Sequence, residues 1–109
     1  MVNKSKILSD LSKMAVDAMS TFSGLRKEVE TLDERVKTVI SEIVAAGKTP
    51  IVIGGGHNNC YPIISSYSSP IQVLNVDPHA DIRKKEGRHS GNGFTYALES
   101  GSLSDYFVL

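Results

Sequence analysis

The feature that most constrains this chain is an apolar run, residues 71–76, that leads directly into Asp77, His79 and Asp81. The run is short, contains β-branched residues and has no breaker, which is typical of a buried strand. In extended backbone, alternate side chains point to one face. We therefore expect three metal-capable side chains to converge beyond the carboxyl end of a strand, where open α/β sheets bind ligands.

The Asp-Pro-His-Ala-Asp pattern is also compatible with an ordinary surface turn. Asp-Pro is a frequent turn dipeptide, and short motif matches have a real false-positive rate. A metal site at this position therefore requires a further ligand from another segment.

A second apolar segment, residues 50–53, ends in three glycines and His57. Its unbroken apolar character predicts a central parallel strand that is covered on both faces. The glycines permit a sharp turn, and a phosphate-binding loop is disfavoured because the usual glycine-rich spacings are missing. A crossover helix over residues 58–67, with Pro62 in its first turn, would lay residues 71–76 parallel to this strand. His57 would then reach the same edge as the acidic group, which favours the metal site.

The N-terminal part, residues 1–47, is expected to be helical and the remainder, residues 48–109, to be strand–helix–strand, within one partial domain. Apolar residues recur at helical spacing from Ile7. Ser23 and Gly24 are expected to interrupt the helix, and Thr31 with Glu34 forms a possible capping box for a second one. Gly47 suits the C′ position that follows a helix. Packing against a sheet is favoured over a coiled coil or a partner-binding helix, because a predicted strand follows at once.

Composition excludes several classes of protein. Twelve basic and twelve acidic residues among 109 give no net charge, so the basic surface of a nucleic-acid-binding protein is not expected. No apolar run reaches membrane-spanning length, and the N-terminus lacks the apolar core of a signal peptide, so neither a membrane span nor a signal peptide is expected. A single cysteine, Cys60, cannot form an internal disulfide and fits a reducing, cytoplasmic setting.

Three motifs together resemble those of the ureohydrolase superfamily, which includes arginase, agmatinase and formimidoylglutamase. They are Gly-Gly-Gly-His at 54–57, Asp-Pro-His-Ala-Asp at 77–81 and Ser-Gly-Asn-Gly-Phe at 90–94. The resemblance covers residues 35–109 and is closest in motif detail to formimidoylglutamase-like members. It implies an α/β fold of three layers, α-β-α, with a parallel sheet as in arginase, of which this chain would contain about three strands.

The resemblance also implies a centre with two Mn²⁺ ions. His57, Asp77 and Asp81 match ligands of one ion, His79 matches a ligand of the other, and Asp77 matches a carboxylate that bridges both. Mixed imidazole–carboxylate sites suit Mn²⁺. Such a pair of ions holds a water as hydroxide, which would attack the central carbon of a small amidine or guanidine substrate. No catalytic side chain beyond that hydroxide is implied.

Substrate contacts are implied for Arg83, Ser90 and Asn92. Arg83 is more like the formimidoylglutamases than arginase, and a guanidinium pairs well with the carboxylates of N-formimidoyl-L-glutamate, whose products would be glutamate and formamide. Phe94 replaces the proton-shuttling histidine of arginase. An agmatinase- or arginase-like guanidino hydrolase and a non-catalytic module stay open as alternatives, as does a solvated loop for the charged run 83–88. Pro78, where the family has Ala, removes a backbone donor.

The superfamily's later Asp-x-Asp ligands have no counterpart after Asp81. Residues 104–109 are expected to form a strand. We therefore expect an N-terminal piece of the enzyme that is inactive alone. Unpaired strand edges would favour a homo-oligomer, because exposed edges template further pairing.

Overall fold

The computed structural model describes residues 3–109, and its longest element is helix α1, Lys4–Ala45. The side chain of Asn3 caps the helix by accepting a hydrogen bond from the Lys6 N–H at 3.1 Å. At the other end, Gly47 has φ 69°, and its N–H donates to the Val44 carbonyl at 2.9 Å. The Lys48 N–H donates to the Ile43 carbonyl at 3.1 Å, which completes a Schellman motif. The C′ role predicted for Gly47 is confirmed.

The predicted interruption of this helix at Ser23 and Gly24 is wrong, since α1 passes through both residues. One exposed glycine costs a helix about 1 kcal/mol, which an already propagating helix tolerates. The capping box at Thr31 is also wrong. Its hydroxyl donates to the Lys27 carbonyl at 3.1 Å, as a threonine in the middle of a helix does.

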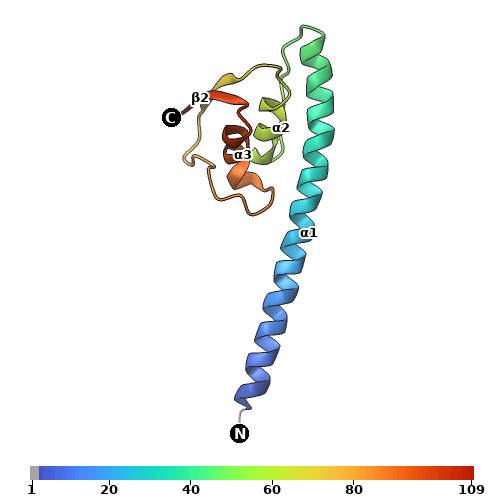
Figure 1. Ribbon diagram of the computed structural model, residues 1–109, viewed down its shortest axis with the longest axis vertical. Coiled ribbons are helices and arrows are strands. Elements are labelled where there is room, and N and C mark those ends of the chain that lie inside the picture. Colours follow the sequence, from blue (N-terminus) through green and yellow to red (C-terminus); the bar gives the residue numbers. More distant parts are fainter. Residues whose placement is uncertain (1–2) are drawn as a thin grey trace.

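The remaining elements are short and follow one another in a compact unit beside α1 (Figure 1). The helix predicted over residues 58–67 is present in shortened form, beginning as a 3₁₀ turn, and Pro62 lies buried in its first α-helical turn as expected. The elements are η1 His57–Asn59, α2 Cys60–Ile64, β1 Ile71–Asn75, η2 Ser90–Asn92, α3 Gly93–Glu99 and β2 Leu103–Val108.

Strands β1 and β2 form a parallel sheet, with a register that runs from Ile71 opposite Leu103 to Asn75 opposite Val108. The α/β class and the two predicted strands near 71–76 and 104–109 are therefore confirmed. The strand predicted at residues 50–53 is not formed, and the described residues contain a two-stranded sheet instead of about three strands. A strand needs a neighbour for its backbone N–H and C=O groups; residues 50–53 lie apart from the sheet, and Ile51 and Ile53 are 85% and 94% exposed.

The core lies between α2, α3 and the sheet. Its buried residues are Ile64, Phe94, Ala97 and Leu103. The rings of Phe94 and Tyr106 stack with their centroids 4.4 Å apart. The carboxyl-terminal half of α1 covers this unit, whereas its amino-terminal half extends beyond it, so that the molecule measures 70 Å in its longest direction (Figure 1). Of the helices in residues 3–109, none has the length and apolar character needed to cross a membrane.

Candidate metal centre

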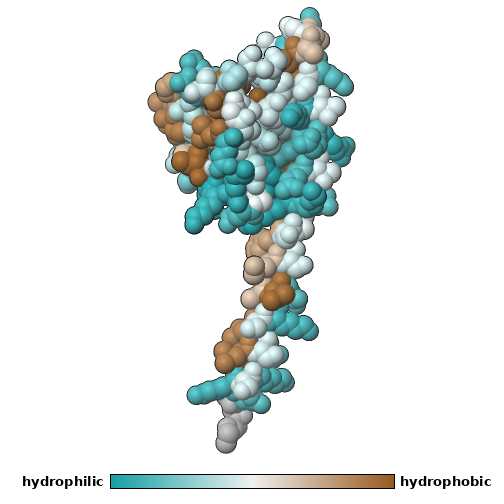
Figure 2. Space-filling view, viewed as in Figure 1, coloured by the Kyte–Doolittle hydropathy of each residue, from teal (hydrophilic) through white to brown (hydrophobic). Residues whose placement is uncertain are grey.

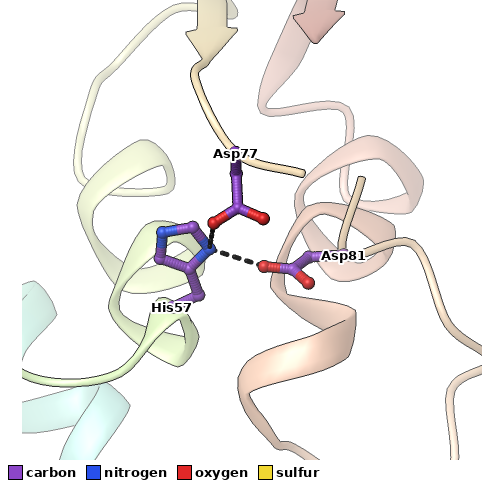
Figure 3. A group of neighbouring side chains, drawn as sticks. All are labelled: His57, Asp77 and Asp81. Carbon is purple, nitrogen blue, oxygen red and sulfur yellow. Dashed lines mark hydrogen bonds and ion pairs between the residues drawn. The ribbon is translucent and has the colours of Figure 1, made fainter. Parts of the chain in front are cut away.

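The side chains of His57, Asp77 and Asp81 meet beyond the carboxyl end of β1 (Figure 3). Nδ1 of His57 lies 2.6 Å from Oδ2 of Asp81 and 3.6 Å from Oδ2 of Asp77. One ligand atom from each residue lies within 4.8 Å of the other two. His57 is 20 residues from Asp77 and 24 from Asp81 in the sequence, and the fold brings all three together. It does so although the segment before His57, residues 50–53, is not a strand of the sheet.

The position of His57 depends on the glycine turn before it. Gly54 and Gly55 have φ values of 89° and 81°, which lie in the left-handed region that glycine enters without steric cost. The chain then enters η1, where the Asn59 N–H donates to the Gly56 carbonyl at 3.1 Å. This turn directs the imidazole toward the end of β1, as the sequence predicted.

The segment that contains the two carboxylates is a tight loop. Oδ1 of Asp77 accepts a hydrogen bond from the His79 N–H at 2.7 Å, which is the usual contact of an Asx turn. Asp81 has φ 49°, in the left-handed region that aspartate tolerates better than most residues. The turn returns Asp81 to the side of Asp77, so the alternation of a straight strand is not what brings the two together.

Two residues that the sequence analysis did not single out hold this loop. The buried Asn75 amide donates to the His79 carbonyl at 3.1 Å and to the Tyr106 hydroxyl at 3.0 Å. The Tyr106 hydroxyl in turn donates to the Ala80 carbonyl at 2.7 Å. Burial raises the pKa of Tyr106, which keeps the hydroxyl a donor. Asn75 is, with Gln72, one of two polar residues in the run 71–76, and this was the available signal for it.

His79 lies outside this group of three. Its side chain is 78% exposed, and its Nδ1 is 3.4 Å from Oδ1 of Asp77. The structure therefore places it beside the carboxylate that was predicted to bridge two ions. Its role as a ligand of a second ion stays a prediction.

An imidazole and two carboxylates form a donor set suited to a divalent cation such as Mn²⁺. The three groups remain accessible: the side chains of His57, Asp77 and Asp81 are 44%, 24% and 15% exposed. The contact between His57 Nδ1 and Asp81 Oδ2, at 2.6 Å, is a short hydrogen bond to a carboxylate. These residues therefore fit one metal ion in kind and in proximity.

The predicted substrate residues Arg83 and Ser90 lie next to the cluster. Both are exposed and line an open hollow of about 420 Å³ that also contains Asp81 and His79. Two residues that line the hollow are joined by a backbone hydrogen bond, from the Arg83 N–H to the Gly91 carbonyl at 3.0 Å. A small molecule could contact Arg83 and Asp81 together in it.

Asn92, the third predicted substrate residue, is fully buried. Its Oδ1 accepts from Arg88 Nη1 at 3.0 Å and from the His89 N–H at 3.1 Å. Its Nδ2 donates to the carbonyls of Lys84 and Gly87 at 3.1 and 2.8 Å. In this arrangement Asn92 holds the loop together, and a substrate contact, which stays a prediction, would require that network to open.

Arg88 differs from the solvated loop considered for the charged run 83–88, and His89 follows that run. Arg88 is 2% exposed and pairs with Asp33 of α1. His89 has its Nδ1 3.1 Å from the Gly91 N–H and its Nε2 3.2 Å from Glu86 Oε1, so it serves a structural role in the loop. The other charged members of the run, residues 83–86, are exposed.

Comparison with known proteins agrees with the motifs. The model of the arginase family matches residues 3–108. A formimidoylglutamase from Streptococcus pyogenes serotype M3 is 30% identical over 111 aligned positions, which cover 90% of this chain and 34% of that protein. A formimidoylglutamase from Staphylococcus carnosus is 40% identical over 63 residues, 53% of this chain and 20% of that protein.

A mitochondrial guanidino acid hydrolase from Homo sapiens is 33% identical over 75 residues, 63% of this chain and 21% of that protein. The chain thus spans a fifth to a third of the length of these relatives. No solved structure matches it. The family match extends over nearly all of the sequence and includes each of the residues that meet at the end of β1, and the chain therefore belongs to the arginase family.

Proposed function

We propose that this chain carries part of the metal centre of a hydrolase that cleaves C–N bonds in linear amidines, with N-formimidoyl-L-glutamate as the preferred substrate. The observation that supports this most directly is the convergence of His57, Asp77 and Asp81 at the end of β1. Two of the relatives described above are named formimidoylglutamase, which agrees with that substrate.

In this proposal, His57, Asp77 and Asp81 hold Mn²⁺, and His79 contributes to a second ion. Bound divalent ions supply Lewis acidity and lower the pKa of a water molecule near the substrate. The chain's own contribution is to hold these ligands in place. Asn75 and Tyr106 do this for the carboxylates by securing the backbone of residues 79 and 80.

Arg83 is proposed to orient the substrate. Arg83 is exposed and lines the same open hollow as Asp81. Guanidinium groups pair well with carboxylates. N-formimidoyl-L-glutamate carries two carboxylates, so an arginine near the metal centre favours it over substrates without an acid group. Ser90, on the rim of the same hollow, can donate a further hydrogen bond.

The second candidate is a guanidino acid hydrolase, which the name of the human relative favours. A guanidino acid also presents a carboxylate to Arg83, whereas agmatine does not. The presence of Arg83 therefore disfavours agmatine as a substrate. It discriminates less between N-formimidoyl-L-glutamate and a guanidino acid, because both carry a carboxylate. A non-catalytic module is the third possibility, and it predicts no metal binding at His57.

Self-association and a cytoplasmic location stay predictions from the sequence.

The first prediction concerns metal binding by the full 109-residue chain. Titration with Mn²⁺, followed by the electron paramagnetic resonance of the free ion, should show binding that His57→Ala and Asp81→Ala abolish. Each variant removes one of the three clustered ligands. Asp105→Ala is the matched control, because it removes an exposed carboxylate whose side chain contacts Gln72 on the sheet. Absence of binding in the wild type, or equal loss in the control, would sink the proposal.

The substrate class is tested with the same protein. Isothermal titration calorimetry in the presence of Mn²⁺ should detect binding of N-formimidoyl-L-glutamate but not of agmatine, and Arg83→Ala should abolish that binding. Because the later Asp-x-Asp ligands of the family are missing from the sequence, we expect no formamide or urea release from this chain alone. Binding of agmatine in preference to the acid would contradict the role given to Arg83.

A further inference from the structure

Arg88 is the most completely buried charged residue in the described part of the chain, with 2% exposure. Its guanidinium carbon lies 4.9 Å from the ring centroid of Tyr61 and 4.7 Å from that of Tyr96. Both distances are within the range of cation–π contacts, which are strongest where water is excluded. A side chain held in this way has little freedom to move.

The guanidinium contacts three separate segments. Nε donates to Asp33 Oδ2 of α1 at 2.6 Å, and Nη1 donates to Asn92 Oδ1 at 3.0 Å. Nη2 donates to the backbone carbonyl of Asn58 at 2.9 Å. Asn58 directly follows His57 within η1, so one arginine connects the long helix, the Ser-Gly-Asn segment and the turn that carries the imidazole.

We propose that Arg88 is a positioning residue for the metal centre, which fixes the His57 turn through the Asn58 carbonyl and anchors it to α1 through Asp33. The metal part of this inference rests on the function proposed above, whereas the fixing of the turn does not. Arg88 does not contact the carboxylates of Asp77 and Asp81 and does not line the hollow beside them. It acts on His57 through the peptide backbone.

The geometry requires a guanidinium. Its planar fork carries donors in fixed directions and can satisfy a carboxylate, an amide oxygen and a backbone carbonyl at once, whereas an ammonium is a point charge on a flexible stem. Burial raises the pKa of Asp33 above its ordinary value even though Arg88 opposes that change. The buried Asp33 carboxylate needs the Arg88 guanidinium, because removing one member of a buried ion pair leaves the other charge without a partner, which is costly.

Two variants separate positioning from general stability. Arg88→Lys keeps the charge and loses the fork. The double variant Asp33→Leu with Arg88→Met removes both buried charges, which often leaves stability little changed, but it also removes the contact to Asn58. Arg26→Lys is the matched control, because Arg26 also connects α1 to the loop, through Glu86, without touching η1.

The first readout needs no metal. Amide hydrogen exchange of the metal-free protein reports on the Asn59 N–H, which donates to the Gly56 carbonyl within the turn. We expect both Arg88 variants to raise its exchange on the order of tenfold relative to the amides of β1, and Arg26→Lys to leave it unchanged. Unchanged exchange at Asn59, or an equal rise throughout the sheet, would overturn the proposal.

The second readout is the affinity for Mn²⁺, measured as above. Loss of residues that orient metal ligands typically costs 10- to 100-fold in affinity, and we expect a loss of about that size for Arg88→Lys but not for Arg26→Lys. If the Arg88 variants bind Mn²⁺ as the wild type does, the positioning role is wrong. If the wild type binds no Mn²⁺, the proposed function fails, and the exchange at Asn59 still decides the role of Arg88.

Discussion

The two halves of α1 share one sequence pattern and have different surroundings. Every residue from 3 to 25 is exposed, including apolar ones such as Leu11, Met19 and Phe22. In the other half, Asp33 and Ile40 are buried against the compact unit. The free half shows its apolar side chains as separate brown areas along a projecting rod (Figure 2). A periodic apolar pattern thus predicts a helix, but it does not show whether a partner covers that face.

The covered half is held by specific contacts as well as by apolar packing. Arg88 pairs with Asp33, and the Ser66 hydroxyl donates to the Lys37 carbonyl at 3.2 Å. Isolated helices owe little stability to propensity alone, and most of it comes from tertiary packing. We therefore expect the two regions to respond very differently to equivalent substitutions.

The largest difference is expected between two phenylalanines. Phe94 is 4% exposed in the core, whereas Phe22 is 59% exposed on the free half of α1. Phe94→Ala should lower the free energy of unfolding by about 3–5 kcal/mol because it leaves a cavity. Phe22→Ala should change it by less than about 0.5 kcal/mol. Urea unfolding followed by circular dichroism measures both, and equal effects would show that the free half is covered in solution.

Thiol reactivity should differ next most. Burial raises the pKa of Cys60 to about 12, and the thiolate is the reactive form. In a Ser23→Cys variant, alkylation near pH 8 should modify the new exposed thiol on the order of a hundredfold faster than Cys60. Mass spectrometry of the modified peptides measures both rates.

The same pKa sets a stability trend. The unfolded thiol loses its proton near pH 9.0, before the folded one does, so Cys60 contributes a fall in stability as the pH rises from that value toward 12.

In the alkylation experiment, a Cys60 as reactive as the thiol at position 23 would mean that α2 does not pack on the core. Cys60→Ser serves as the control for non-specific labelling.

The smallest effect is expected at a glycine. A Cβ built on Gly24 meets nothing within 4 Å, so Gly24→Ala should stabilise α1 by about 1 kcal/mol and raise the helical signal. In the compact unit the sign reverses: a Cβ on Gly93 would overlap the Cys60 sulfur and lie 3.1 Å from the His57 carbonyl. Thermal melts followed at 222 nm compare the two, and a stabilising Gly93→Ala would contradict this packing.

Several features could be predicted from local sequence because local chemistry decides them. The C′ role of Gly47 follows from the conformational freedom of glycine, and the strand at β1 follows from its β-branched residues. The convergence of His57 with Asp77 and Asp81 joins distant segments and was predicted from the order of the motifs. Their metal-binding role stays a prediction. The break at Gly24 was wrong because one unfavourable residue does not end a helix that is stable on both sides.

The amino-acid sequence by itself determined the class of the protein and its family motifs, because these depend on residue type and short spacing. The order of those motifs along the chain also predicted which residues meet at the end of β1. Only the tertiary structure decided that residues 50–53 remain unpaired and that the buried Asn92 holds its loop together by hydrogen bonds. It also decided that Arg88 joins α1 to the His57 turn. Strand pairing and buried ion pairs join groups from distant segments. A local pattern contains no information about which distant partner is present.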